Sequence, residues 1–233
     1  MNKVIIITGT RKGIGKELSK YYLEKGFFVA GCSRGEPNIS HENYLHYSLD
    51  VADEKSVVKM VKEVYKKFGR VDVLLNNAGI ASMNHLILTP YSTVRNILNT
   101  NFLGSFLFIR ESAKIMIKQK YGRIVNFSTV AVPLQLEGEA IYASSKVAIE
   151  KLTKIAAKEL GGFGITINAI GPVPVSTDLI KNIPAKKINN LLSKQAIRRY
   201  GEIRDIANVI DFFIDDKSDF ITGQVIYLGG VVV

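Results

Sequence analysis

The sequence is poor in the residue types that build disulfides and metal centres. Its 233 residues include one cysteine, Cys32, and three histidines, His41, His46 and His85. A single cysteine excludes an intrachain disulfide and a cysteine-clustered zinc or iron–sulfur site. The histidines lack the spacing of zinc ligands, so we expect no metal at the functional site.

Long hydrophobic runs are also absent. No apolar run approaches the roughly 18–20 residues of a membrane span. The apolar start, Val4–Ile7, is too short and too soon interrupted for a secretory signal. We therefore expect a cytoplasmic protein that makes no use of a membrane.

Acidic residues are outnumbered: 31 Lys and Arg stand against 21 Asp and Glu, a formal net charge of +10. This excess has two interpretations, attraction of an anionic partner and a solvated, lysine-rich surface. The lysines are scattered at spacings typical of the outer faces of helices, as at Lys55, Lys59 and Lys62. The surface interpretation is favoured, and a nucleic-acid partner is not expected.

Short apolar runs alternate with longer amphipathic stretches along the whole chain. This alternation predicts a parallel sheet covered by helices on both faces, and with no linker or repeat it predicts a single doubly wound α/β domain over residues 1–233. The expected strands are Val4–Ile7, Phe27–Gly31, Val73–Leu75, Ile124–Phe127, Thr166–Ile170 and Val225–Leu228, and the expected helices are Ile14–Glu24, Ser56–Phe68, Thr93–Lys118, Tyr142–Leu160 and Ile206–Phe213. Gly171–Arg199, with three prolines, predicts a loop with short helical pieces, and we expect a substrate lid at about residues 173–199.

A glycine-rich turn follows the first strand. Gly9, Gly13 and Gly15 stand directly before the first expected helix. Glycines there allow a tight turn and let backbone N–H groups approach a pyrophosphate, which the helix N-terminus also attracts. Glycine-rich turns are common for steric reasons alone, but this one lies where a dinucleotide binds in such a fold.

The end of the second strand indicates which dinucleotide fits. Sites that prefer NAD usually place a carboxylate there, whereas this chain has Ser33 and Arg34. A serine and an arginine can bind a 2′-phosphate, and Lys12 in the glycine turn adds a second cation. The sequence therefore favours NADPH over NAD, although Glu36 nearby keeps NAD in consideration.

Tyr142 and Lys146 lie four residues apart, which places a phenol and an ammonium on one face of a helix. A neighbouring cation favours the ionised form of a tyrosine, so such a pair suits proton transfer. Tyr21 and Lys25 have the same spacing but lie toward the end of the first helix, away from the expected ligand edge. Tyr142 is therefore the better candidate.

Taken together, these motifs resemble those of the short-chain dehydrogenase/reductase family, and most closely its 3-oxoacyl-(acyl-carrier-protein) reductases. The resemblance runs from the first strand to the last and implies a seven-stranded sheet. The motifs that carry it are the glycine turn, Asn76–Gly79, Asn101, Tyr142 with Lys146, Ile203–Ala207 and Ile221–Gln224.

The resemblance implies a role for each matching residue. Tyr142 would protonate the substrate carbonyl, while Lys146 would hold the nicotinamide ribose and lower the pKa of Tyr142. Asn101 would bend its helix and hold a water for proton relay. Asp50 would contact the adenine, and Thr177 would bond the nicotinamide carboxamide or a phosphate. The full set of expected cofactor-binding residues is Gly9, Arg11, Lys12, Gly13, Ile14, Gly15, Ser33, Arg34, Asp50, Val51, Asn77, Ala78, Gly79, Tyr142, Lys146, Pro172, Val175 and Thr177.

Three positions depart from the family pattern. The catalytic serine position holds Thr129, preceded by Ser128, so either hydroxyl is a candidate and Thr129 is preferred. Val173 replaces the glycine that often opens the lid, and Leu228 replaces a polar residue before the final glycines. The acid Tyr142 is retained, so we expect an active enzyme.

The expected function is NADPH-dependent reduction of a ketone or aldehyde, including a 3-oxoacyl thioester. The alternatives are oxidation of a sugar, cyclitol or other secondary alcohol, and a non-catalytic, NADP-binding regulatory protein. A carrier-protein partner would need a basic rim at the entrance, which Lys120 fits and Phe163 does not. The family also implies a homotetramer or homodimer formed through the two longest helices.

Overall fold

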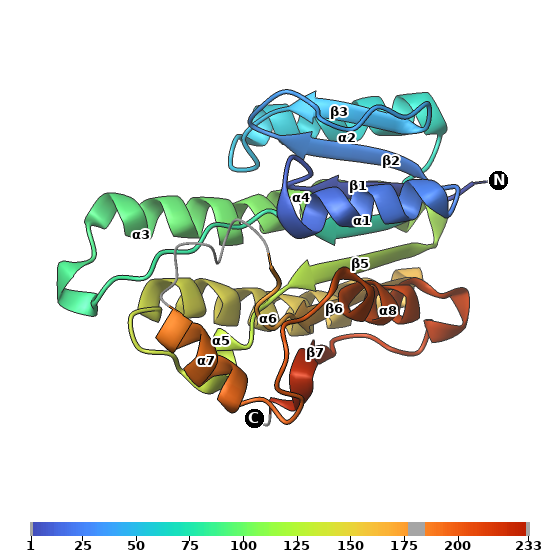
Figure 1. Ribbon diagram of the computed structural model, residues 1–233. Helices are drawn as coiled ribbons and strands as arrows, with labels where there is room; N and C mark the ends of the chain where they lie inside the picture. Colours follow the sequence, from blue (N-terminus) through green and yellow to red (C-terminus); the bar gives the residue numbers. More distant parts are fainter. Residues whose placement is uncertain (1, 177–184, 232–233) are drawn as a thin grey trace.

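Seven strands form one parallel sheet in the computed structural model, which describes residues 2–176 and 185–231 (Figure 1). The order along the sheet is β3-β2-β1-β4-β5-β6-β7, and every neighbouring pair is parallel, which confirms the doubly wound class. The strands are β1 (Val4–Thr8), β2 (Phe28–Ser33), β3 (Tyr44–Ser48), β4 (Val73–Asn76), β5 (Gly122–Phe127), β6 (Ile165–Gly171) and β7 (Val225–Tyr227).

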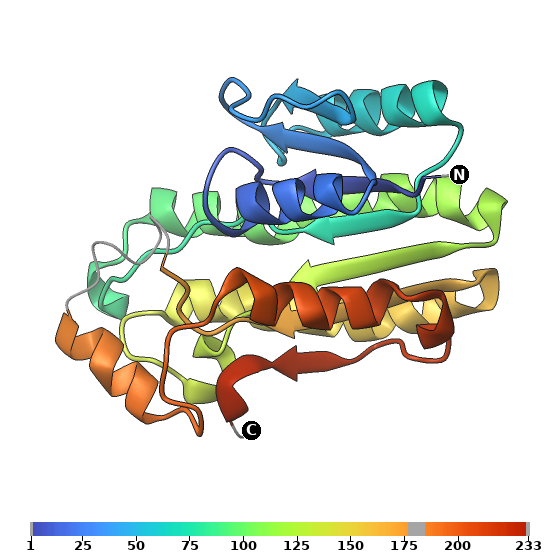
Figure 2. The same ribbon diagram turned by 45° about the vertical axis from the view of Figure 1, so that its right-hand side comes forward.

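Both faces of the sheet are covered by helices (Figures 1 and 2). All five residues of β1 are buried, and alternate side chains point to opposite faces. Ile5 and Ile7 pack with α1 (Gly13–Glu24) and α8 (Ile203–Ile214), whereas Val4 and Ile6 pack with the helices of the other face. Those helices are α2 (Glu54–Phe68), α4 (Gly104–Gln119) and α6 (Ala140–Leu160).

Local sequence signals explain where several helices begin and end. Asp53 caps α2 by accepting a hydrogen bond from the backbone N–H of Ser56, and Gly69 ends that helix in the left-handed conformation. Glu202 and Asp205 form a reciprocal capping box at the start of α8. These caps satisfy backbone groups that a helix end leaves unpaired.

One expected helix is interrupted. The predicted stretch 93–118 divides into α3 (Tyr91–Ile97), a π-helical segment (Leu98–Leu103) and α4, because the backbone widens around the buried Asn101. Two shorter helices, α5 (Ala131–Leu134) and α7 (Ala185–Ser193), extend beyond the carboxyl ends of the strands (Figure 1). The sequence pattern also missed β3, a half-buried edge strand.

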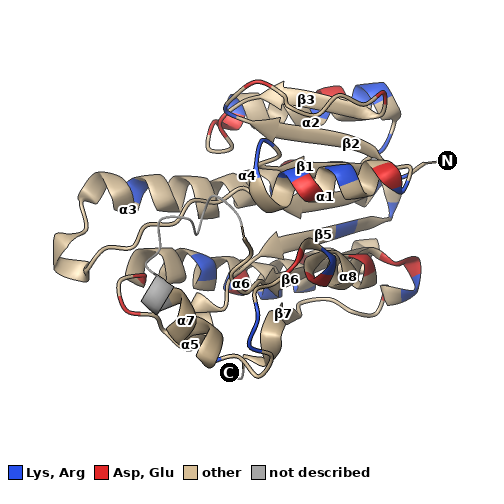
Figure 3. Cartoon of the chain, viewed as in Figure 1, with Lys and Arg blue, Asp and Glu red and all other residues tan. Residues whose placement is uncertain are grey.

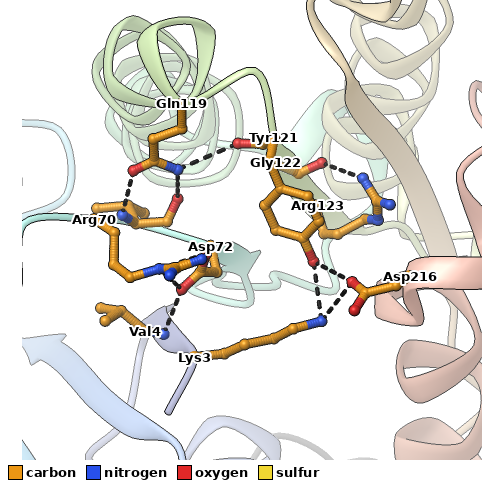
Figure 4. Close-up of polar contacts among 10 residues, drawn as sticks. Lys3, Val4, Arg70, Asp72, Gln119, Tyr121, Gly122, Arg123 and Asp216 are labelled. Atoms are coloured by element: carbon orange, nitrogen blue, oxygen red, sulfur yellow. Dashed lines mark hydrogen bonds and ion pairs between the residues drawn. The ribbon is translucent and has the colours of Figure 1, made fainter. Parts of the chain in front are cut away.

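Polar contacts stabilise the amino edge of the sheet, where the strands begin (Figure 4). The fully buried Asp72 carboxylate accepts hydrogen bonds from the backbone N–H of Val4 at 2.8 Å and from the Arg70 guanidinium at 2.6–2.9 Å. Nearby, the exposed Asp216 carboxylate accepts from Lys3 at 2.6 Å and from the Tyr121 hydroxyl at 2.8 Å.

These two carboxylates make a matched test of burial. Asp72→Ala leaves the Val4 N–H buried without a partner, so we expect it to lower the free energy of unfolding by about 2 kcal/mol. Asp216→Ala removes a pair that water already screens, so its cost is expected to stay below about 1 kcal/mol. Urea denaturation of both variants measures the difference, and equal losses would contradict this account.

Positions of Lys, Arg, Asp and Glu are spread over many of the helices and loops of the ribbon rather than confined to one (Figure 3). Lys120 lies between α4 and β5, so the structure places it at the amino edge. Ligands collect at the carboxyl edge of such a sheet, so Lys120 does not lie on the rim of its own subunit's site. None of the described helices is both long and apolar enough to span a membrane.

Candidate active site

A cavity of about 860 Å³ opens at the carboxyl ends of the strands. Its lining includes residues from the ends of β1, β2, β4, β5 and β6, and thus spans the point between β1 and β4 where the strand order reverses. Dinucleotides bind at this place in doubly wound sheets, and the volume suits a large ligand. The expected site residues that line it are Gly9, Arg11, Lys12, Gly13, Ile14, Ser33, Arg34, Asp50, Val51, Asn77, Ala78, Gly79, Thr129, Tyr142, Lys146, Pro172 and Val175.

Two expected site residues are not part of the cavity lining, and a third is not among the described residues. Gly15 is buried inside the turn, and Asn101 is fully buried behind the cavity wall. Thr177 falls outside the described residues, as does part of the expected lid. The described part of that segment contributes α7, whose residues Ile188 and Leu191 line the cavity.

Close backbone contacts fix the glycine turn. A Cβ on Gly15 would lie 2.4 Å from the Gly9 carbonyl oxygen and 2.3 Å from Asn77 Nδ2, so no larger residue fits there. Gly9 has φ +78°, which also favours glycine. Asn77 Nδ2 donates to the Thr8 carbonyl at 2.9 Å, which ties the end of β4 to the turn. The turn therefore leaves the backbone close to any ligand above it, as a pyrophosphate requires.

Three cations line the cavity where the glycine turn approaches the end of β2. Arg11, Lys12 and Arg34 line the cavity together with Ser33, and these cations form no ion pair with any residue that the structure describes. Guanidinium, ammonium and hydroxyl donors are the groups that bind a phosphate. The donor set thus fits the 2′-phosphate of NADP better than the free hydroxyl of NAD.

The two candidate hydroxyls of the site point to different partners. Thr129 lies close enough to Tyr142 for its hydroxyl to lower the pKa of the phenol, and its Oγ1 accepts a hydrogen bond from the Ala131 N–H at 3.2 Å. The Ser128 hydroxyl instead donates to Glu150, which also accepts from the Tyr227 hydroxyl at 2.5 Å. The geometry therefore pairs Thr129, and not Ser128, with the tyrosine.

A pair of substitutions tests this pairing. Thr129→Val keeps the shape of the side chain but removes the hydroxyl that faces Tyr142, so we expect turnover to fall about 10²-fold. Ser128→Ala removes the hydroxyl that faces Glu150, so its turnover is expected to stay within about threefold of the wild type. Steady-state kinetics decides: a larger loss in Ser128→Ala would assign the role to Ser128.

Tyr142 holds its proton firmly. Burial raises its pKa to about 12, the Thr129 hydroxyl opposes that rise, and the negative charge of Glu139 adds to it. In this structure, which contains no ligand, the expected lowering of the Tyr142 pKa by Lys146 is therefore not found. At neutral pH the phenol is protonated and ready to donate.

Lys146 is a buried ammonium without a carboxylate partner among the described residues. It is 4% exposed, and its Nζ donates to the Phe127 carbonyl at 2.8 Å. Burial lowers its pKa to about 8. A buried, unpaired charge costs stability, and perturbed lysines of this kind cluster at functional sites.

Asn101 joins the loop after β4 to the helix that carries Tyr142. Its Oδ1 accepts from the Ile80 N–H at 2.9 Å, and its Nδ2 donates to the Ile80 carbonyl and to Ser145 Oγ, each at 3.0 Å. Ser145 Oγ in turn donates to the Tyr142 carbonyl at 2.7 Å. A Cβ on Gly79 would lie 3.4 Å from both Asn101 Oδ1 and Lys146 Nζ, which places these two polar groups side by side.

The sequence motifs did not indicate part of the cavity wall or the hydrogen bonds of His46 beside it. Gly35, Leu49 and Thr100 line the cavity although no motif indicated them. His46 contacts the Ser33–Gly35 turn, a role hidden while histidines were considered only as metal ligands. Among the described residues there is no group of side chains that could hold a metal ion.

Comparison with known proteins finds relatives that match nearly the whole chain. Residues 9–230 match the family model described as Enoyl-(Acyl carrier protein) reductase. The 3-oxoacyl-[acyl-carrier-protein] reductase FabG of Staphylococcus epidermidis is 33% identical over 99% of this chain and 98% of its own length. The FabG of Thermotoga maritima is 34% identical with the same coverage.

Solved structures show the same fold. A structure of ElxO with NADP bound has a TM-score of 0.91 and 34% identity, covering 99% of this chain and 98% of its own. The aldohexose dehydrogenase of Thermoplasma acidophilum has a TM-score of 0.89 and 26% identity, covering 99% and 94%.

Proposed function

Because the chain belongs to the short-chain dehydrogenase/reductase family, we propose that it is an NADPH-dependent reductase of a carbonyl group. The observation that carries this proposal is that Tyr142, Thr129 and the buried Lys146 line the same cavity at the carboxyl edge of the sheet. Membership of the family makes the chain an oxidoreductase that acts on alcohol and carbonyl groups. Tyr142 keeps its proton at neutral pH, as the general acid of a reduction requires.

The cofactor proposal depends on the chain's own donors. Arg11, Lys12, Ser33 and Arg34 would hold the 2′-phosphate, and the Gly9–Gly15 turn would hold the pyrophosphate. The ElxO structure with NADP bound supports this choice. NADPH supplies a hydride when it is bound, and the protein supplies the proton.

Tyr142 would act as the general acid. Thr129, which lines the cavity together with Tyr142, would donate to the same carbonyl oxygen and so polarise it. The Lys146 ammonium would bind the nicotinamide ribose and stabilise the tyrosinate that remains after proton transfer. Asn101 would keep Tyr142 in place through Ser145 and hold the Ile80 backbone beside Lys146.

The substrate proposed is a 3-oxoacyl thioester. Apolar side chains that could face an acyl chain line the cavity alongside polar ones such as Gln135, Asn190 and Lys194. The apolar ones are Met83, Leu136, Val173, Ile188 and Leu191. Such side chains suit an acyl chain, and the FabG relatives are named for such substrates. A carrier protein remains part of the proposal, but its docking surface would not include Lys120 of the same subunit.

We further propose a homotetramer. Phe106 on α4 and Val147 and Ile155 on α6 are 36–48% exposed, and Phe212 on α8 is 47% exposed. Large apolar side chains on helix surfaces are typical of subunit contacts. Light scattering that found only a 25.8 kDa monomer would contradict this part of the proposal.

The proposed function is tested with purified protein, NADPH or NADH, and a panel of 3-oxoacyl thioesters, simple ketones and sugars. The proposal expects kcat/KM with NADPH to exceed that with NADH at least tenfold, and 3-oxoacyl thioesters to be the best substrates. Turnover of sugars alone would redirect the assignment to alcohol oxidation.

A further inference from the structure

A chain of hydrogen bonds crosses the sheet from the glycine turn to the end of β2. Thr10 Oγ1 lies 2.9 Å from the Tyr44 hydroxyl, which lies 2.9 Å from His46 Nδ1. His46 Nε2 lies 2.9 Å from the Gly35 carbonyl oxygen and 3.2 Å from Ser33 Oγ. The chain therefore ends on the Ser33–Gly35 turn, which lines the cavity.

A glycine in the middle of β2 makes room for this chain. Gly31 pairs with His46 across the two strands. A Cβ on Gly31 would lie 2.4 Å from the Tyr44 hydroxyl and 2.6 Å from Thr10 Oγ1. A glycine inside a strand weakens it, so its presence here marks a close approach that the site requires.

The partners fix the direction of the chain. The Gly35 carbonyl can only accept, so His46 Nε2 carries the hydrogen. In the neutral imidazole Nδ1 is then an acceptor, the Tyr44 hydroxyl donates to it, and Thr10 donates to Tyr44. The result is a single tautomer of His46 with its donor aimed at Gly35.

The Gly35 carbonyl has a second close donor, the Ser33 hydroxyl, at 2.9 Å. A bound phosphate accepts hydrogen bonds, so Ser33 must turn its hydroxyl away from Gly35 to bind one. While His46 donates to the Gly35 carbonyl, this rotation of the Ser33 hydroxyl leaves that carbonyl with a hydrogen-bond donor. Without His46, the one other donor near this carbonyl among the described residues is the exposed Ser48 hydroxyl, at 3.5 Å.

We propose that His46 is a positioning residue for recognition of the cofactor 2′-phosphate: by satisfying the Gly35 carbonyl it frees the Ser33 hydroxyl for the phosphate. This inference rests on the proposed use of NADPH. The 2′-hydroxyl of NAD can itself donate to Ser33, so NAD binding needs no such turn and does not depend on His46. His46 therefore contributes to selectivity between the two cofactors and not to dinucleotide binding in general.

The test compares 2′,5′-ADP with 5′-AMP, which differ only in the 2′-phosphate, by calorimetry and without turnover. His46→Leu is expected to weaken 2′,5′-ADP binding about tenfold and to leave 5′-AMP binding within about twofold. His46→Gln, whose amide can donate to Gly35, is expected to keep 2′,5′-ADP binding within about threefold of the wild type. Unchanged 5′-AMP binding also shows that each variant is folded.

A double-mutant cycle distinguishes this role from a purely structural one. In a Ser33→Ala background no hydroxyl has to turn, so His46→Leu is expected to cause no further loss of 2′,5′-ADP affinity. Additive losses, or equal losses for both ligands, would overturn the role of His46. If wild type prefers 2′,5′-ADP and His46→Leu keeps that preference, only this inference fails. If wild type binds the two ligands equally, the proposed choice of NADPH fails as well.

Discussion

Tyr142→Phe is expected to lower turnover about 10²–10⁴-fold, because it removes only the hydroxyl that donates the proton. The phenol is protonated at neutral pH, since burial raises its pKa to about 12. Its ring would still fill the same space, so NADP affinity, measured by calorimetry, should stay within about twofold of the wild type. Kinetics with the best substrate of the panel measures the loss.

A matched control comes from the second tyrosine with the same spacing to a lysine. The Tyr21 hydroxyl donates to Asp211 at 2.6 Å on the outside of α1, and Lys25 binds the same carboxylate. Tyr21→Phe should therefore leave turnover unchanged. A Tyr142→Phe protein with full turnover would remove the tyrosine from the mechanism.

Lys146→Met is expected to abolish most of the activity and to stabilise the fold. Burial lowers the Lys146 pKa from 10.5 to about 8, and each unit corresponds to about 1.4 kcal/mol, so the charge costs about 3 kcal/mol at pH 7. Loss of the hydrogen bond to the Phe127 carbonyl offsets about 1 kcal/mol of that cost. We expect a net gain of about 2 kcal/mol in urea denaturation at pH 7, together with a loss of turnover of about 10²-fold.

The pH dependence of the free energy of unfolding provides an independent check that Lys146 is buried as an ammonium. Below pH 8 the lysine is charged in both the folded and the unfolded state, so the full penalty applies. Between pH 8 and 10.5 the folded state releases its proton while the unfolded state keeps it, and the wild type regains stability. The advantage of Lys146→Met should therefore shrink between pH 7 and pH 9.5. A destabilised variant, or an advantage that grows with pH, would contradict the assignment.

The fold was predictable wherever burial dominates. β1, β4 and β6 are continuously buried, and such strands consist mainly of consecutive apolar residues, which the sequence shows directly. β3 was missed because it is a half-buried edge strand whose Tyr, His and Ser residues resemble a polar loop. The break between α3 and α4 was not visible in the periodicity either, since it depends on Asn101 pairing with Ile80 twenty-one residues away.

The candidate site was predictable where one motif supplies the chemistry and less so where distant segments meet. The glycine turn and the Tyr142–Lys146 pair carry local signals. The partners of Thr129 and Ser128 depend instead on how β5, α6 and β7 pack, which the sequence alone left open. The role of His46 depends on the register of β3 against β2, which places it beside Gly31.

Transfer of deuterium from NADPH labelled at C4 of the nicotinamide tests the central claim most directly. The protein is incubated with a 3-oxoacyl thioester and each C4 epimer of the labelled cofactor, and the product is analysed by mass spectrometry. The account predicts one deuterium at the carbinol carbon with one epimer only, and label transfer slower by about 10²–10⁴-fold with Tyr142→Phe. NADPH that binds with no label in any product of the carbonyl panel would contradict the proposed reductase.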